Sequence, residues 1–155
     1  MAIRRGDRAP AFELPQGPGE VVDLAEHIGR DKVVLLFFPL AFSSVCTAEL
    51  CRITSDWVEW DELDARVFGI SIDSPFVVKR FREEEGIGFP LLSDFNKTVA
   101  AEYGVLYEEL VGLKGVAKRS AFVIDRSGVV VYDWVSEDSG VEPDYEAIKR
   151  AVEAA

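Results

Sequence analysis

The sequence has few of the residues that hold metal ions or cross-link a chain. Its 155 residues include two cysteines, Cys46 and Cys51, and a single histidine, His27. Zinc sites in proteins draw mainly on cysteine and histidine, so a zinc site here would need carboxylates at unfavourable spacings. Two cysteines in a chain without an export signal also argue against a permanent structural disulfide. We therefore expect no metal and no cofactor, and two reduced, working thiols.

Positive charge and long apolar runs are scarce as well. The chain has 17 Lys and Arg against 28 Asp and Glu, a formal net charge of -11. This charge argues against a nucleic-acid partner and against attraction to anionic lipid. No segment approaches the roughly 20 apolar residues of a membrane span. Residues 1–7 contain two arginines but no apolar stretch typical of a signal peptide. We expect a cytoplasmic protein.

The order of apolar and polar segments predicts one α/β domain over residues 1–155, since no linker, repeat or low-complexity segment interrupts it. Residues 11–14 and 20–23 flank a Pro- and Gly-rich turn and predict a hairpin. The apolar run 33–38 predicts a central strand covered on both faces. Further strands are predicted at 67–72, 89–92, 121–125 and 129–134, and helices at 44–64, 75–85, 97–103 and 145–154. Together these elements predict a three-layer sandwich with a mixed sheet.

Some helical side chains are better explained by packing or solvation than by binding. Trp57 and Trp60 lie three residues apart within the predicted helix 44–64, so we expect both to pack in the core. In the predicted helix 75–85, the i,i+4 pairs of Lys79 with Glu83 and of Arg80 with Glu84 predict a solvated face. Ser74 and Gly86 are expected to cap this helix.

The segment from Pro39 to Cys46 carries the chemistry. It follows the apolar run 33–38 and delivers Cys46 to the start of the next helix. There, unpaired N–H groups and the helix dipole favour an anion, and the thiolate is the reactive form of cysteine. The spacing therefore predicts an activated nucleophile, with the hydroxyl of Ser43 three residues before it. The alternatives are an inert core cysteine and a serine that only caps the helix.

Several motifs resemble those of the peroxiredoxins. Pro39, Ser43 and Cys46 fit the signature Pro-x-x-x-Thr/Ser-x-x-Cys, and the segments 89–94, 103–105 and 119–128 follow in family order. The resemblance covers nearly the whole chain. It implies a thioredoxin-like fold with an N-terminal hairpin, and a peroxidase that reduces hydrogen peroxide and organic hydroperoxides at a thiol.

The resemblance also implies roles for individual residues. Cys46 would be the peroxidatic cysteine, which attacks a peroxide oxygen and becomes a sulfenic acid. Ser43 would orient the peroxide, and Pro39 would close the pocket over the thiolate. Arg119 would lie beside the sulfur and stabilise negative charge, and Glu49 would orient Arg119. The alternatives are a surface charge at Arg119 and, at Glu49, an acid that faces the helix dipole.

The sequence around Cys51 is compatible with two catalytic cycles. Its spacing from Cys46 resembles the Q-type, or bacterioferritin-comigratory, peroxiredoxins, in which a cysteine five residues on resolves the sulfenic acid. The surrounding sequence at 37–42 and 89–95 instead resembles the one-cysteine alkyl hydroperoxide reductase E type. In an intact helix the Cα atoms of residues i and i+5 lie about 8.6 Å apart, whereas disulfides rarely exceed about 7 Å. A Cys46–Cys51 disulfide therefore requires local unwinding.

Our hypothesis is that this unwinding occurs and that a thioredoxin- or glutaredoxin-like protein reduces the disulfide. One alternative is a one-cysteine enzyme with a structural Cys51 and an external thiol as resolver. Another is a non-catalytic peroxide sensor or holdase. A thioredoxin-type oxidoreductase would normally use Cys-x-x-Cys, which the sequence lacks. A monomer and a homodimer that associates through the loops around Phe42 both remain open.

Overall fold

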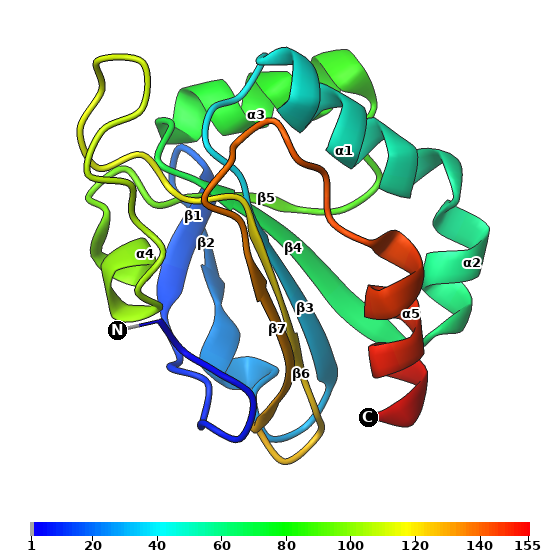
Figure 1. The fold of residues 1–155 in the computed structure, drawn as a ribbon. Helices are drawn as coiled ribbons and strands as arrows, with labels where there is room; N and C mark the ends of the chain where they lie inside the picture. The colour runs from blue at the N-terminus through cyan, green and yellow to red at the C-terminus, as the bar shows by residue number, and fades with distance from the viewer. Residues whose placement is uncertain (1) are drawn as a thin grey trace.

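A five-stranded mixed sheet forms the centre of the fold in a computed structural model that describes residues 2–155. The strand order is β5-β4-β3-β6-β7, with β3, β4 and β5 parallel and β6 and β7 antiparallel to their neighbours (Figure 1). The strands are β3 (Lys32–Phe37), β4 (Ala65–Ser71), β5 (Leu91–Ser93), β6 (Ser120–Ile124) and β7 (Val130–Val135). A separate antiparallel hairpin consists of β1 (Glu13–Gly17) and β2 (Glu20–Asp23). The mixed sheet and the N-terminal hairpin are as predicted.

Helices cover both faces of this sheet. They are η1 (Leu24–Glu26, a 3₁₀ helix), α1 (Ser44–Ser55), α2 (Trp57–Glu62), α3 (Pro75–Glu85), α4 (Thr98–Glu102) and α5 (Tyr145–Ala154). Buried residues of α1, α2, α3 and α5 share one core cluster, while the hairpin and α4 contribute to a second cluster (Figure 1). No helix within the described residues is long and apolar enough to cross a membrane.

Strand β3 and the residue after it supply both cores. Alternate side chains of a strand point to opposite faces, so Val33, Leu35 and Phe37 pack in one cluster. Val34, Leu36 and Phe38 pack in the other. All six side chains are fully buried, and burial of each contributes about 1.5–3 kcal/mol. The prediction of a central strand covered on both faces is confirmed.

The prediction of one continuous helix over residues 44–64 is wrong. The helix breaks at Asp56, whose backbone leaves the α conformation with φ -98° and ψ 19°, and α2 begins at Trp57. Aspartate is a poor residue for a helix interior because its side chain competes for nearby polar groups. Here the Asp56 carboxylate accepts a hydrogen bond from Nε of Arg52 at 3.2 Å. Beyond the break, the ring of Trp57 stacks on Phe89 with centroids 5.7 Å apart, and Trp60 is buried.

The predicted caps of α3 are confirmed. The hydroxyl of Ser74 accepts a hydrogen bond from the backbone N–H of Val77 at 3.3 Å, and Gly86 ends the helix in the left-handed conformation with φ 63°. That conformation favours glycine because a Cβ would be strained there. Lys79 differs from its prediction, since it pairs with Glu20 of the hairpin rather than with Glu83.

The first strand also differs from its prediction. It begins at Glu13 and continues through Pro15 to Gly17, so the turn is shorter than the expected Pro- and Gly-rich segment. Proline fits here because the hairpin strand is an edge and the strand pairing shifts between Pro15 and Gly17.

Candidate active site

The start of α1 places Cys46 in a position that favours an anion. Ser43 is the N-cap residue of α1, and Cys46, the third helical residue, is fully buried. Backbone N–H groups in the first turn of a helix have no partner within the helix, and they give this end a partial positive charge. Phe42 lies in the preceding turn with a φ of 65°, and its ring packs against the ring of Phe81 with centroids 4.8 Å apart.

The sheet register brings Arg119 to the same point. Phe37, the last residue of β3, pairs with Ser120, the first residue of β6. Arg119 precedes Ser120 and therefore lies beside the segment that leads from β3 into α1. Its side chain is buried, and its guanidinium donates three hydrogen bonds. The prediction that Arg119 lies near Cys46 in space, although 73 residues separate them, agrees with this geometry.

Each guanidinium nitrogen of Arg119 has a partner. Nη2 donates to Sγ of Cys46 at 3.1 Å, Nη1 donates to Oε2 of Glu49 at 2.5 Å, and Nε donates to the carbonyl oxygen of Ser139 at 3.0 Å. Because the guanidinium is planar and its donors have a fixed geometry, these three bonds determine its orientation. The surface-charge alternative for Arg119 does not fit this arrangement, and Glu49 contacts Arg119 as the resemblance implied.

Burial changes the charge balance of this cluster. Burial raises the pKa of Glu49 to about 7, although the adjacent Arg119 acts to lower it. Burial acts to lower the pKa of Arg119, but Glu49 and Cys46 together raise it above its ordinary value. The guanidinium is therefore charged at every physiological pH, whereas Glu49 changes its charge near neutrality.

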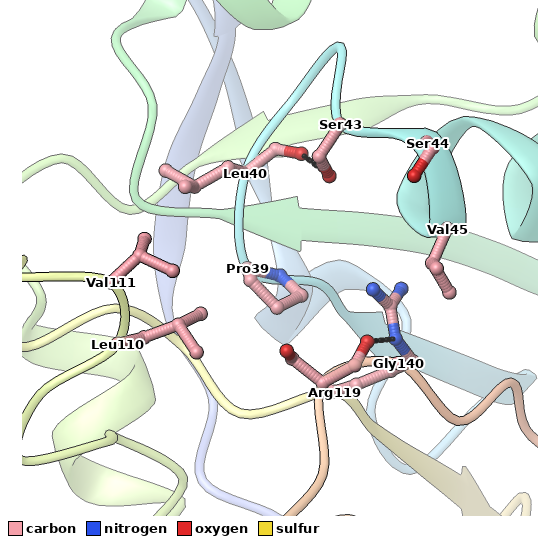
Figure 2. Close-up of a pocket in the computed structure, with 10 residues that line it drawn as sticks. Pro39, Leu40, Ser43, Ser44, Val45, Leu110, Val111, Arg119 and Gly140 are labelled. Atoms are coloured by element: carbon pink, nitrogen blue, oxygen red, sulfur yellow. Dashed lines mark hydrogen bonds between the residues drawn. The ribbon is translucent and has the colours of Figure 1, made fainter.

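A pocket of about 210 Å³ opens above Arg119 (Figure 2). It is lined by Pro39, Leu40, Ser43, Ser44, Val45, Leu110, Val111, Arg119, Ser139 and Gly140. Pro39 forms part of the wall, as the resemblance implied. The Ser43 hydroxyl donates to the carbonyl oxygen of Leu40 at 2.7 Å. Within residues 2–155 its side chain makes no capping hydrogen bond, although Ser43 occupies the N-cap position of α1.

The sequence analysis missed part of this pocket. Leu110 and Val111 come from the loop between α4 and β6, and Ser139 and Gly140 come from the loop between β7 and α5. No local pattern identifies these residues, because they reach the pocket only through the folding of two long loops.

Comparisons with known proteins identify the family. The AhpC/TSA family matches residues 5–133. The chain belongs to this family. Alkyl hydroperoxide reductase E of Mycobacterium tuberculosis is 37% identical over 127 residues, which are 81% of this chain and 80% of the relative. The crystal structure of peroxidoxin BcpB from the same organism has a TM-score of 0.85 and 34% identity, covering 98% of this chain and 97% of that one.

Another solved structure supports the fold alone. A cysteine-to-serine mutant of PrxQ from Xylella fastidiosa has a TM-score of 0.85 at 21% identity and covers 99% of this chain and 98% of that one. The thioredoxin-like architecture predicted from the sequence is thus confirmed. As a peroxiredoxin, this AhpC/TSA family member is an oxidoreductase that reduces peroxides at a thiol.

Cys51 lies on α1 outside the polar cluster of this peroxiredoxin. It is partly buried, and its Sγ lies 3.9 Å from Oε2 of Glu85 on α3. Burial raises the pKa of the Cys51 thiol, and the negative charge of Glu85 raises it further. In the part of the chain that the structure describes, neither Cys46 nor Cys51 forms a disulfide. Both cysteines lie within an intact α1.

Proposed function

We propose that Cys46 is the peroxidatic cysteine of this peroxiredoxin and that Cys51 resolves its sulfenic acid through an intramolecular disulfide. The observation that carries the first part is the contact of Arg119 Nη2 with Cys46 Sγ, at 3.1 Å, at the start of a helix. A buried cation and a helix N-terminus both stabilise a thiolate. The thiolate attacks one peroxide oxygen, the S–O bond forms as the O–O bond breaks, and the departing oxygen takes up a proton.

The pocket residues support roles for Ser43 and Pro39 in this step. The Ser43 hydroxyl lines the pocket, and it can orient a peroxide oxygen by exchanging its bond with the Leu40 carbonyl. Pro39 lines the same pocket as Arg119, and its rigid ring, which has no N–H donor, would limit access to the sulfur. Apolar side chains of Leu40, Val45 and Leu110 dominate the remaining lining. Such a lining accepts organic hydroperoxides as well as hydrogen peroxide.

Resolution requires Cys46 to approach Cys51. The Cys51 thiol gives up its proton, and the resulting thiolate attacks the sulfur of the sulfenic acid. The S–S bond forms as the S–O bond breaks, and the departing hydroxide takes up that proton and leaves as water. An intact helix holds the two Cα atoms about 8.6 Å apart, beyond the range of about 7 Å for disulfides. The start of α1 therefore has to unwind in each cycle.

The packing of α1 favours unwinding of its first five residues. Of residues 44–48, Cys46 alone is buried. Further along, Leu50 and Ile53 are fully buried, and Thr54 Oγ1 accepts a hydrogen bond from the N–H of Gly88 at 3.1 Å. Unwinding of residues 44–48 thus exposes one buried side chain, whereas unwinding of residues 50–55 would expose two more and break this bond.

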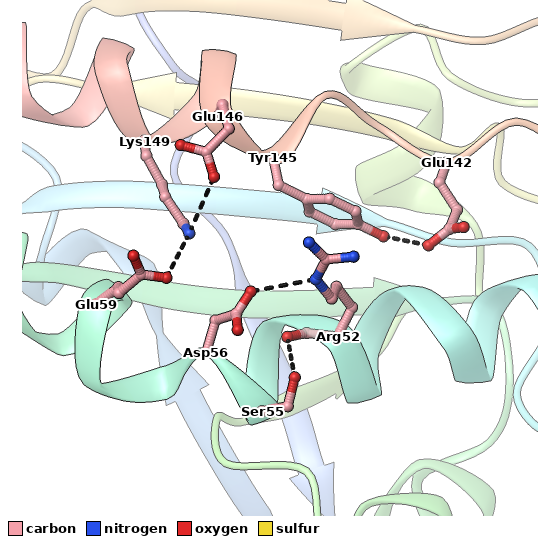
Figure 3. A network of polar contacts seen from close by, with 8 residues as sticks. All are labelled: Arg52, Ser55, Asp56, Glu59, Glu142, Tyr145, Glu146 and Lys149. Atoms are coloured by element: carbon pink, nitrogen blue, oxygen red, sulfur yellow. Dashed lines mark hydrogen bonds and ion pairs between the residues drawn. The ribbon is translucent and has the colours of Figure 1, made fainter.

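A polar network also ties the end of α1 to α5 (Figure 3). The guanidinium of Arg52 lies over the ring of Tyr145, 5.6 Å from its centroid, and bonds to Asp56 at 3.2 Å. The Tyr145 hydroxyl donates to Glu142 at 2.5 Å. Exposed contacts of this kind are individually weak, but all of them lie beyond Cys51 in the chain. We infer that Cys51 keeps its place while Cys46 moves toward it.

A one-cysteine cycle is the second candidate. The observation that favours it is the environment of Cys51, since burial and the Glu85 carboxylate both raise the pKa of its thiol and so disfavour the attacking thiolate. In that cycle an external thiol attacks the Cys46 sulfenic acid directly, and α1 need not unwind.

Peptide mapping under non-reducing conditions separates the two cycles. After one equivalent of hydrogen peroxide, we expect a peptide that contains a Cys46–Cys51 disulfide, with the Cys51→Ser variant as the matched control. A sulfenic acid on Cys46 together with an alkylatable Cys51 in the wild-type chain would establish the one-cysteine cycle instead. Catalytic peroxide consumption with a reductant, rather than a single stoichiometric event, distinguishes an enzyme from a sensor or holdase.

We further propose that the protein works in the cytoplasm with a thioredoxin- or glutaredoxin-like reductant, as a monomer or a homodimer. The cysteine content supports a reducing compartment, because small proteins of oxidising compartments are commonly stabilised by several disulfides and this chain has two cysteines. Steady-state turnover with each reductant in turn tests the partner, and light scattering in both redox states tests the assembly. The absence of turnover with both the thioredoxin-like and the glutaredoxin-like protein would refute the proposed reductant class.

A further inference from the structure

Two acidic groups share a single buried cation in the active site. Cys46 Sγ and Glu49 Oε2 each accept a hydrogen bond from the guanidinium of Arg119, and all three side chains are shielded from solvent. The second oxygen of the carboxyl group, Glu49 Oε1, is buried and has no hydrogen-bond partner within residues 2–155. A buried oxygen without a partner is more unfavourable in a charged carboxylate than in a neutral carboxylic acid, because burial penalises the charged form most.

The other groups that face Glu49 do not supply positive charge. Glu142, in the loop before α5, adds negative charge and raises the pKa of Glu49 together with burial. The Tyr145 hydroxyl of α5 is committed to Glu142, and the neighbouring Arg52 pairs with Asp56. Arg119, which immediately precedes β6, is therefore the cation that contacts Glu49 among the described residues.

The charges in this cluster balance only when one of the two acids is protonated. With a Cys46 thiolate, a Glu49 carboxylate and the Arg119 guanidinium, the buried cluster would carry one uncompensated negative charge. An uncompensated charge in a buried site is strongly unfavourable, and the group takes up a proton instead. With one proton in place, the cluster is neutral.

We propose that Glu49 and Cys46 share one proton across Arg119, so that Glu49 is a neutral carboxylic acid while Cys46 is a thiolate, and becomes a carboxylate when Cys46 is oxidised. This inference rests on the proposed peroxidatic role of Cys46. Glu49 is then a positioning residue that acts through Arg119, and its charge follows the redox state of the cysteine.

The reaction balances within the site. Before the reaction, the cluster holds a thiolate, a guanidinium and a carboxylic acid. The thiolate sulfur loses two electrons as it forms the S–O bond, the O–O bond breaks, and the departing alkoxide or hydroxide gains a proton to become an alcohol or water. Afterwards, the cluster holds a neutral sulfenic acid, a guanidinium and a carboxylate. The proton released by Glu49 equals the proton taken up by the departing oxygen, and the cluster is neutral in both states.

Infrared difference spectroscopy tests this proposal in the Cys51→Ser variant, where the sulfenic acid accumulates. On addition of one equivalent of hydrogen peroxide, we expect the loss of one carboxylic-acid carbonyl band and the gain of carboxylate bands. The same experiment with Glu49→Gln in the Cys51→Ser background should show no such loss, because an amide does not titrate. If the glutamine variant does not fold, Glu49→Asp keeps the acid and should shift the frequency of the lost band.

Proton uptake provides the second readout. At a pH just above neutrality, oxidation of the Cys51→Ser variant should take no net proton from the solvent, whereas the additional Glu49→Gln change should make it take one proton per Cys46 oxidised. Mass spectrometry of the same samples reports the sulfenic acid. Sulfenic acid at Cys46 without loss of the carbonyl band would overturn the proton-sharing proposal alone. The absence of sulfenic acid at Cys46 would overturn the proposed peroxidatic role and this inference with it.

Discussion

The buried carboxyl group of Glu49 predicts a specific dependence of stability on pH. Burial raises its pKa in the folded chain from 4.5 to about 7. Between these values the folded chain holds a proton that the unfolded chain has released. The free energy of unfolding therefore falls as pH rises through this interval. Below this pH interval, Glu49 is protonated in both the folded and the unfolded chain, and its stabilising contribution is complete.

The expected loss of unfolding free energy follows from the folded and unfolded pKa values of Glu49. One pKa unit corresponds to about 1.4 kcal/mol of difference between the two protonation states. The interval between 4.5 and about 7 thus corresponds to a loss of about 3 kcal/mol of unfolding free energy on going from acidic to neutral pH. Glu49 is fully buried, so solvent screening does not reduce this figure appreciably.

Urea denaturation at a series of pH values measures this loss in the Cys46→Ser background, where the proton of Cys46 does not enter the same balance. Other titrating groups also change stability with pH, so the relevant quantity is the difference between Cys46→Ser and the double variant that adds Glu49→Gln. We expect the double variant to lack the fall of about 3 kcal/mol between pH 4.5 and 7. The exposed Glu84 provides the matched control, because Glu84→Gln should leave the profile of the Cys46→Ser variant unchanged. Parallel profiles with and without Glu49→Gln would refute the assignment of a titrating acid at this position.

Three further predictions concern the catalytic cycle. Arg119→Ala removes the donor to the Cys46 sulfur and should slow oxidation of Cys46 by about 10²–10³-fold, as for the loss of a donor to a developing negative charge. Stopped-flow tryptophan fluorescence measures this rate, and a change of less than threefold in a folded variant would contradict the role of Arg119 in oxidation. Cys51→Ser should leave the rate of Cys46 oxidation unchanged but stop turnover with a dithiol reductant in a peroxide-consumption assay, and full turnover would exclude Cys51 as the resolver. Glu85→Gln removes the negative charge beside Cys51 and should lower the pKa of the Cys51 thiol. In the Cys46→Ser background, the pH profile of Cys51 alkylation should therefore shift to lower pH. An unshifted profile would rule out this electrostatic effect of Glu85.

Much of the reactive segment is determined by the sequence alone. The apolar run from Val33 to Phe38 predicts a strand buried on both faces because its length and composition suit a two-sided core. The serine before the helix and the cysteine in its first turn are local features, and helix termini depend on residues within about one turn. The peroxiredoxin signature lies in this same segment. The proposed nucleophile and its helix could therefore be predicted without the fold.

The break between α1 and α2 shows the limit of local patterns. The apolar periodicity over 44–64 is compatible with a single helix, and the sequence contains no strong signal of a stop within it. The chain nevertheless breaks at Asp56, and just beyond the break Trp57 packs against Phe89, a residue far along the chain. Packing of this kind overrides local propensity, which is a weak determinant of helix boundaries.

Only the tertiary structure decided what surrounds the nucleophile. The pairing of Phe37 with Ser120 sets Arg119 beside the start of α1, and the carbonyl of Ser139 then fixes its orientation. The sequence suggested that Glu49 contacts Arg119, but not that its second oxygen is buried without a partner among the described residues. These properties depend on sheet register and on complete exclusion of water, which arise from contacts between distant segments. The sequence predicted which residue reacts, and the fold determined the charges that surround it.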